Sequence, residues 1–239
     1  MRLAVVGASG RMGRAVVRLA HAEGVEIVCA VGSTDIGRDV GELAGVGAFG
    51  TCVVDGLAAI EHARADVVVD FSAPGATLAL APIAAAAGSA LVSGTTGLGD
   101  DARAALDRAA SQVPVLWEPN MSLGVHVLTE LVSRAASALA DWDAEIVETH
   151  HRAKVDAPSG TALRLAEALG RANVGVHALR GGDVVGDHTV HLLGGGERLE
   201  LTHRATNRDV FAHGALRAAR WLVGRPPGRY SLRDVLGSA

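Results

Sequence analysis

Apolar runs and helical periodicities alternate along the first half of the chain. The runs rich in Val, Ile and Leu are too short for helices and are typical of buried strands. Between them, apolar residues recur at the spacing of amphipathic helices. The pattern predicts strands in residues 2–7, 25–31, 65–72, 89–97 and 113–120, and helices in residues 10–24, 75–88 and 100–112. Strand–helix alternation requires right-handed crossovers, so we expect a Rossmann-like, doubly wound parallel sheet.

The pattern changes at about Ser122. The segments that follow are predicted to be a long helix capped by Ser122, a strand and a second helix, in residues 122–140, 144–151 and 161–172. In residues 197–203, apolar and polar side chains alternate with a period of two, which indicates a half-exposed strand. We therefore expect a smaller α+β domain with a mixed sheet.

The domain layout follows from these elements. Residues 1–121 should form the first domain and residues 122–213 the second. Residues 214–239 return to a helical pattern, and we expect them to pack back onto the first domain and complete it.

Composition limits the function classes. Aromatic residues make up only 3% of the 239 residues, which favours an Ala, Val and Leu interior of α/β type. A net charge of −4 provides no field for gripping nucleic acid or an anionic membrane. Two cysteines are too few for a disulfide framework. No secretory signal or membrane-length apolar segment is visible, so we expect a soluble, cytoplasmic protein.

The first candidate site is a glycine loop. "GASGRMG" places Gly7, Gly10 and Gly13 between the first strand and the first helix. This spacing is a variant of the dinucleotide fingerprint, in which glycines allow a tight turn, the approach of a pyrophosphate and close helix packing. The second strand ends in Gly32-Ser33 instead of the acidic residue that grips the ribose of NAD. NADPH is therefore at least as good a candidate as NADH. The turns at 93–97 and 118–122 should line the nicotinamide half.

The second candidate site is the segment "ETHHRAKVDAPSGTAL", residues 148–163. His150 and His151 are adjacent on or just past a strand, so we expect them to point to opposite faces and to be poor joint ligands for a metal. One imidazole can instead act as an acid or base, while Lys154 supplies a proton or holds a carboxylate. The turn 159–161 opens a helix and offers hydroxyls and backbone N–H groups to a carboxylate. The cluster indicates a small anionic substrate and no metal.

These motifs, with "VVVDFSAP", "EPNMSLGV" and "GERLELTHRATNR", resemble the 4-hydroxy-tetrahydrodipicolinate reductase (dihydrodipicolinate reductase) family over nearly the whole chain. The resemblance implies reduction of a cyclic dicarboxylate by NADPH or NADH in lysine and diaminopimelate biosynthesis. It also implies that the second domain binds the substrate and that its sheet assembles a homotetramer.

The resemblance also implies residue roles. His150 would donate a proton with Lys154 as its catalytic partner. The substrate-binding residues would be His151, Ser159, Gly160 and Thr161. The cofactor-binding residues would be Gly7, Ala8, Ser9, Gly10, Arg11, Met12, Ser33, Gly94, Thr95, Thr96, Glu118, Pro119, Asn120 and Met121.

The chain departs from the family pattern at three places. It has Gly32-Ser33 where an acidic residue is common, it has Met121 where Phe is frequent, and it is short between Ala172 and Gly182. Two other functions share parts of the pattern. A different nicotinamide-dependent imine or amino-acid reductase would use the same scaffold, and a non-catalytic dinucleotide sensor would need only the glycine loop.

Overall fold

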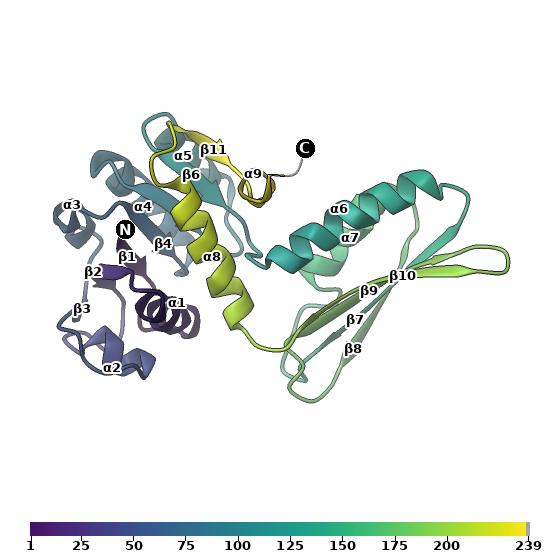
Figure 1. Ribbon diagram of the computed structural model, residues 1–239, viewed down its shortest axis with the longest axis horizontal. Coiled ribbons are helices and arrows are strands. Elements are labelled where there is room, and N and C mark those ends of the chain that lie inside the picture. Colours follow the sequence, from purple (N-terminus) through teal and green to yellow (C-terminus); the bar gives the residue numbers. More distant parts are fainter. Residues whose placement is uncertain (238–239) are drawn as a thin grey trace. The chain divides into compact units, whose positions relative to one another are not determined.

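The computed structural model describes residues 1–237, which divide into two compact units (Figure 1). Among the described residues, the first unit contains residues 1–121 and 209–237, and the second contains Ser122–Arg208. The boundary expected at residue 214 therefore lies at Asp209. Helix α8 (Asp209–Leu222) explains the difference, because it begins at Asp209 and its first turn is hydrogen-bonded to the rest of the helix.

The first unit is built on one parallel sheet of seven strands. In spatial order they are β3 (Val53–Val54), β2 (Glu26–Val31), β1 (Arg2–Val6), β4 (Val67–Asp70), β5 (Ala90–Ser93), β6 (Pro114–Trp117) and β11 (Gly228–Tyr230). The strand order reverses between β1 and β4, as in a doubly wound Rossmann sheet. This confirms the predicted fold of the first half.

Helices cover both faces of this sheet (Figure 1). Helix α1 (Arg11–Ala22) packs with α8, and α4 (Pro74–Ala86) packs with α5 (Asp100–Ala110) and α3 (Ala59–Ala63). The core between sheet and helices is made of Ala, Val and Leu, as the scarcity of aromatic residues predicts. Cys29 lies in this core, and burial raises the pKa of its thiol.

Several short elements of the first unit were not predicted. Helices α2 (Val40–Ala44) and α3 and strand β3 are five residues or fewer, too short to show a periodicity. Strand β11, in the tail expected to be helical, instead pairs with β6 and precedes α9 (Leu232–Leu236). The tail does pack onto the first unit. Gly214 in α8 lies so close to the Met121 carbonyl that a Cβ atom would stand 1.8 Å from its oxygen.

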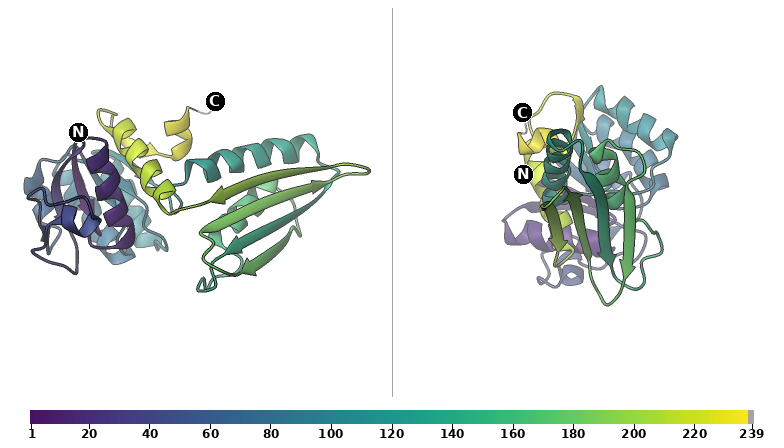
Figure 2. Two further views of the ribbon diagram at one scale, coloured as in Figure 1. Left: turned by 60° about the horizontal axis from the view of Figure 1, so that its bottom comes forward. Right: turned by 90° about the vertical axis from the view of Figure 1, so that its right-hand side faces the viewer.

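The second unit is a mixed sheet with two helices on one face (Figure 2). Its strands, in spatial order, are β10 (Arg198–Ala205), β9 (Gly186–Leu193), β7 (Asp143–His150) and β8 (Gly175–Arg180). Strands β7 and β8 are parallel and the other pairs are antiparallel, which confirms the predicted mixed sheet. Helices α6 (Leu123–Ala138) and α7 (Gly160–Leu169) supply Leu128 and Leu165 to the core.

The face of the second sheet that the helices cover has an apolar part and a buried polar part. Every second residue of β7 faces the helices, so Ile146 joins Val190 of β9 in the apolar core. Further along the same face come Glu148 and His150, both buried, with buried His188 of β9 opposite Glu148. The covered face therefore changes from an apolar layer to a buried polar layer toward the carboxyl end of β7.

A buried carboxylate organises the loops that follow β4 and β5. Asp70 is fully buried at the end of β4 and accepts hydrogen bonds from five donors. They are the backbone N–H of Ser72 at 3.0 Å and the hydroxyls of Ser72 at 2.5 Å, Thr77 at 2.6 Å, Ser93 at 2.9 Å and Thr95 at 3.1 Å. Because these donors come from two loops and α4, the carboxylate fixes the loops relative to one another.

We predict that Asp70→Asn lowers the free energy of unfolding of the first unit by about 3 kcal/mol, because an amide nitrogen would face buried donors that need an acceptor. A urea titration followed by tryptophan fluorescence would measure the change. Trp117 is a suitable reporter, since its indole N–H donates to the Thr95 carbonyl at 2.9 Å. The control Thr77→Val removes a single donor and should cost about 1 kcal/mol. Equal losses in the two variants would contradict the central role of Asp70.

Candidate active site

The glycine loop has the geometry expected of an anion-binding turn. Gly7 has a φ of +78°, and a Cβ atom there would lie 2.4 Å from the Phe71 carbonyl oxygen. A Cβ atom at Gly13 would lie 2.1 Å from the Gly7 carbonyl oxygen, which confirms that this glycine allows close packing of α1. Gly10 precedes α1 and has no side chain to cap it. The first N–H groups of α1 and the positive end of its dipole can therefore meet a phosphate.

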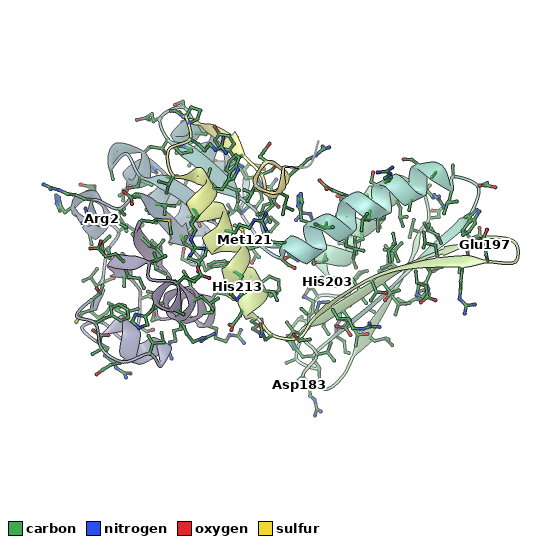
Figure 3. All side chains as sticks on the ribbon, in the orientation of Figure 1. Arg2, Met121, Asp183, Glu197, His203 and His213 are labelled. Atoms are coloured by element: carbon green, nitrogen blue, oxygen red, sulfur yellow. The ribbon has the colours of Figure 1, made fainter. Side chains whose placement is uncertain are left out.

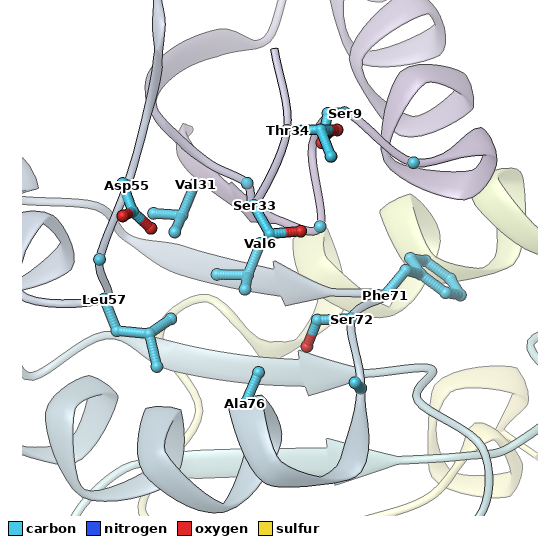
Figure 4. A pocket seen from close by; sticks show the side chains of 15 residues that line it. Val6, Ser9, Val31, Ser33, Thr34, Asp55, Leu57, Phe71, Ser72 and Ala76 are labelled. Carbon is cyan, nitrogen blue, oxygen red and sulfur yellow. Dashed lines mark hydrogen bonds between the residues drawn. The ribbon is translucent and has the colours of Figure 1, made fainter. Parts of the chain in front are cut away.

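A cavity of about 490 Å³ opens beside this loop (Figure 4). It lies at the carboxyl ends of β1, β2 and β4, where the strand order reverses and such sheets bind their ligands. Its lining residues are Val6, Gly7, Ser9, Gly10, Val31, Gly32, Ser33, Thr34, Asp55, Gly56, Leu57, Phe71, Ser72, Ala73 and Ala76. The cavity thus brings together four residues predicted for the cofactor: Gly7, Ser9, Gly10 and Ser33.

The end of β2 presents hydroxyls instead of a carboxylate. Ser33 and Thr34 line the cavity, and the Thr34 hydroxyl donates to Ser9 Oγ at 3.0 Å. A Cβ atom at Gly32 would lie 2.8 Å from Ser9 Oγ and 2.9 Å from Val53 Cγ1, so a side chain there would have to displace these two neighbours. Asp35 is turned to two arginines, Arg14 at 3.0 Å and Arg38 at 3.2 Å.

One acidic residue of the cavity was missed by sequence reasoning. Asp55 follows the two-residue strand β3 and lines the cavity (Figure 4). Its sequence context contains no fingerprint, because β3 is too short to recognise. The strand pairing of β3 with β2 could be found only from the folded sheet.

The other residues predicted to bind the cofactor differ in their position and in their exposure to solvent. Within the part of the chain that the structure describes, the turns 94–96 and 118–121 do not line this cavity. Thr96 and Pro119 are exposed and Asn120 is half-buried. The side chains of Thr95, Glu118 and Met121 are buried, as are Ala8 and Gly94, while Arg11 is exposed and Met12 half-buried. These turns nevertheless lie at the carboxyl edge of the same sheet, after β5 and β6.

The second predicted cluster lies at the carboxyl end of β7. His150 is buried and its Nδ1 atom is hydrogen-bonded to Glu148. His151 follows the strand, and its Nε2 atom lies 3.3 Å from a guanidinium nitrogen of Arg208. Lys154 is half-buried and pairs with Asp156 at 2.7 Å. The two imidazoles therefore have separate partners, although His151 lies just past the end of β7 and not on the strand.

The turn 159–161 opens helix α7, and the polar groups of Ser159 make hydrogen bonds within the protein. Its hydroxyl accepts from the Ala162 N–H at 3.2 Å as the helix cap and lies 3.2 Å from His188 Nε2. Its backbone N–H donates to Glu148 at 3.1 Å, and the residue is only 2% exposed. Ser159 therefore fixes the start of the helix, whereas exposed Gly160 and half-buried Thr161 lie nearer to solvent.

Side chains of β8 and β9 support the cluster at the end of β7. Arg180 of β8 donates to both carboxylate oxygens of Glu148, at 2.8 and 3.0 Å, and to the Asp156 carbonyl at 2.6 Å. His188 meets His150 edge to face, with ring centroids 5.1 Å apart. Sequence reasoning missed Glu148, Arg180, His188 and Arg208. Only Glu148 had a local signal, because it lies two residues before His150 on the same face of a strand.

Burial and charge shift the titration of this network. Burial alone would raise the pKa of Glu148, but hydrogen bonds from Arg180, His150 and Ser159 outweigh it and lower that pKa. Burial lowers the pKa of His150, although Glu148 opposes this effect. Burial, followed by the charge on His150, lowers the pKa of His188 to about 4. Glu148 is therefore ionised and His188 neutral near pH 7.

The donor atoms of Glu148, His150 and His188 lie within 4.8 Å of one another, a spacing that a metal ion could span. Both oxygens of Glu148, however, already accept from the Arg180 guanidinium. Its positive charge would repel a divalent cation, so we assign no metal to the cluster.

Comparison with known proteins matches both units. Residues 1–121 match the model of the dihydrodipicolinate reductase N-terminus, and residues 124–236 match that of its C-terminus. Two bacterial relatives named 4-hydroxy-tetrahydrodipicolinate reductase are similar over 99% of this chain. The protein of Alkalilimnicola ehrlichii is 48% identical with 98% of its length covered, and that of Anaeromyxobacter dehalogenans is 51% identical with 97% covered. An archaeal relative of the same name, from Archaeoglobus fulgidus, is 46% identical with 99% of this chain and all of its own covered.

Solved structures share the fold. A dipicolinate-bound dihydrodipicolinate reductase from Paenisporosarcina sp. TG-14 superposes with a TM-score of 0.79 at 24% identity, covering 97% of each chain. An amine dehydrogenase from Mycobacterium smegmatis has a TM-score of 0.65 at 15% identity, covering 96% of this chain and 94% of its own. No helix within residues 1–237 is both long and apolar enough to cross a membrane. The first unit has a nicotinamide-nucleotide binding fold, and the chain belongs to the dihydrodipicolinate reductase family of oxidoreductases.

Proposed function

We propose that this chain catalyses the NAD(P)H-dependent reduction of 4-hydroxy-tetrahydrodipicolinate to tetrahydrodipicolinate, a step in lysine and diaminopimelate biosynthesis. The observation that carries the proposal is the cluster at the end of β7 in a chain of this family. Two imidazoles, an ammonium and the start of a helix come together there. Such a group suits a small dicarboxylate that takes up a proton.

The first unit is assigned to the cofactor. The glycine turn and the uncapped start of α1 suit the pyrophosphate, and the cavity beside them suits the adenosine. When bound, the reduced nicotinamide supplies the hydride that reduces the substrate imine. The turns 94–96 and 118–121, at the same sheet edge, are assigned to the nicotinamide half.

Both nucleotides fit the adenosine end. The hydroxyls of Ser9, Ser33 and Thr34 leave room for a 2′-phosphate, and among residues 32–34 no carboxylate repels it. Asp55 offers acceptors to ribose or adenine groups of either nucleotide. NADPH is therefore expected to serve at least as well as NADH.

The second unit is assigned to the substrate. One carboxylate fits the start of α7, where the N–H groups of Gly160 and Thr161 and the positive end of the helix dipole attract an anion. Ser159 holds this turn in place as the helix cap. The other carboxylate fits the cations of Lys154 and Arg208, with His151 beside Arg208. A substrate carboxylate would replace Asp156 as the partner of Lys154. The proton comes from His150 or Lys154.

The uncovered face of the second sheet is assigned to self-association. Leu179 is 53% exposed and Leu193 is 37% exposed on this face, where Thr189 and Thr202 also form a hydroxyl pair at 3.0 Å. Among the described elements, both helices of the second unit lie on the other face. A sheet face with exposed leucines is suited to pairing with further copies, and we propose a homotetramer.

We predict that Lys154→Ala lowers kcat/KM for the dicarboxylate by about 10²–10⁴-fold, because the variant loses an acid or anchor for the substrate. The measurement is a spectrophotometric assay of NADPH oxidation with freshly generated substrate, compared with simple imines. Arg152→Ala, an exposed cation of the same loop, is the matched control and should keep its activity. A Lys154→Ala enzyme with near-normal kcat/KM would refute the assigned role.

We predict that Ser33→Asp raises KM for NADPH by about 10-fold or more while changing KM for NADH much less. The new carboxylate would face the 2′-phosphate, and like charges placed together cost several kcal/mol. Steady-state kinetics with each nucleotide give the ratio, and Ser33→Ala controls for loss of the hydroxyl. A parallel rise for both nucleotides would place the 2′-phosphate elsewhere.

A further inference from the structure

We propose that Glu148 is a positioning residue for the reduction: it holds His150 as the Nδ1–H tautomer, so that Nε2 is the atom that exchanges a proton with the substrate. Arg180 fixes the carboxylate in this task. The inference rests on the proposed function and adds to it a choice between His150 and Lys154 as the proton donor.

The geometry begins with the pleat of β7. Residues two apart on a strand point to the same face, so Glu148 and His150 lie side by side on the covered face. Glu148 Oε2 and His150 Nδ1 are hydrogen-bonded there. The contact is built into the strand itself, and a loop movement cannot remove it.

The carboxylate of Glu148 is held from three elements. Arg180 of β8 donates to both of its oxygens, Ser159 at the start of α7 donates its backbone N–H, and His150 contributes from β7. The Glu148 side chain is fully buried. A buried carboxylate with four donors is ionised and has no freedom to turn.

An ionised carboxylate can only accept hydrogen bonds, so the proton of the shared contact belongs to His150 Nδ1. Once Nε2 has given up its proton, the neutral imidazole that remains is the Nδ1–H tautomer. Glu148 stabilises this tautomer and also the imidazolium that precedes it. The arrangement lets one nitrogen exchange protons while the other stays bonded.

The surroundings of Nε2 agree with this assignment. A Cβ atom at Gly186 would lie 2.9 Å from His150 Nε2, so any side chain at this position would press against the nitrogen that the proposal uses, and glycine avoids that contact. The charged and titratable groups that face His150 are Glu148 of its own strand, Arg180 of β8, His188 of β9 and Lys154 of the following loop. Among these four, only Glu148 is negative.

If Glu148 had only a structural role, its ion pair with Arg180 would be sufficient, because that pair does not involve His150. The two roles differ in what they predict for the imidazole. If Glu148 acts through His150, removing its charge must change both the tautomer and the pH at which His150 loses its proton. If Glu148 only anchors β8 to α7, both properties stay the same.

The tautomer can be measured on the unaltered protein. With ¹⁵N-histidine labelling, long-range ¹H–¹⁵N spectra above the titration of His150 show which nitrogen carries the proton, and His150→Gln identifies its signals among the ten histidines. We expect Nδ1–H. An Nε2–H tautomer would overturn the proposal, whether or not any Glu148 variant folds.

The second test is the pH dependence of kcat/KM for Glu148→Gln. An amide can donate to Nδ1 and favours the wrong tautomer, so kcat/KM should fall by about 10-fold or more at pH 7–8. Loss of the negative charge lowers the pKa of His150. Because a proton donor works only below its pKa, the descending limb of the profile should move to lower pH by about one unit or more.

KM for the cofactor should be unchanged, since Glu148 lies in the second unit. Glu23→Gln, which alters an exposed glutamate beside His213 in the first unit, is the control and should keep the wild-type profile. A wild-type enzyme that reduces the substrate, with a Glu148→Gln limb that does not move, would refute the positioning role and leave the proposed function standing. A wild-type enzyme inactive with the substrate would instead refute the proposed function.

Discussion

A carboxylate that is withdrawn from water must be given its hydrogen bonds by the chain, and this constraint organises both units of the protein. In the first unit the carboxylate is Asp70, at the end of β4, with donors from two loops and α4. In the second it is Glu148, near the end of β7, with donors from β8, the start of α7 and His150. Each carboxylate fixes the segments that the function requires to be held together.

The two carboxylates do different work. The donors to Asp70 are hydroxyls and a backbone N–H, so its main effect is to set the shape of the loops after β4 and β5. Glu148 has a cation and an imidazole among its donors, so it also affects protonation. The same pairing with Arg180 that keeps Glu148 ionised disfavours a metal ion in a cluster whose other donor atoms could hold one.

The cavity beside the glycine loop and the cluster at the end of β7 also differ in how much of each could be predicted from the sequence. Gly7 and Gly13 are recognisable because they lie where neighbouring backbone leaves no room for a side chain. This close packing arises where a strand turns directly into a helix, and that pattern is visible in the sequence. Ser159 was predicted to belong to a carboxylate-binding turn, and the fold uses its hydroxyl and N–H for hydrogen bonds within the protein. A motif shows which polar groups are present, but the packing around it decides which of them remain for a ligand.

The sequence by itself determined the alternating parallel sheet, the mixed second sheet, the glycine turn and the His150–Lys154 cluster, because periodicity and spacing are local properties of the chain. Only the tertiary structure decided the start of α8 at Asp209, the pairing of β11 with β6, and the places of Asp55, Arg180, His188 and Arg208. Arg180 and Arg208 lie far in the sequence from Glu148 and His151, and Asp55 follows a strand too short to recognise. Their roles depend on strand pairing and burial, and no short window of sequence contains either.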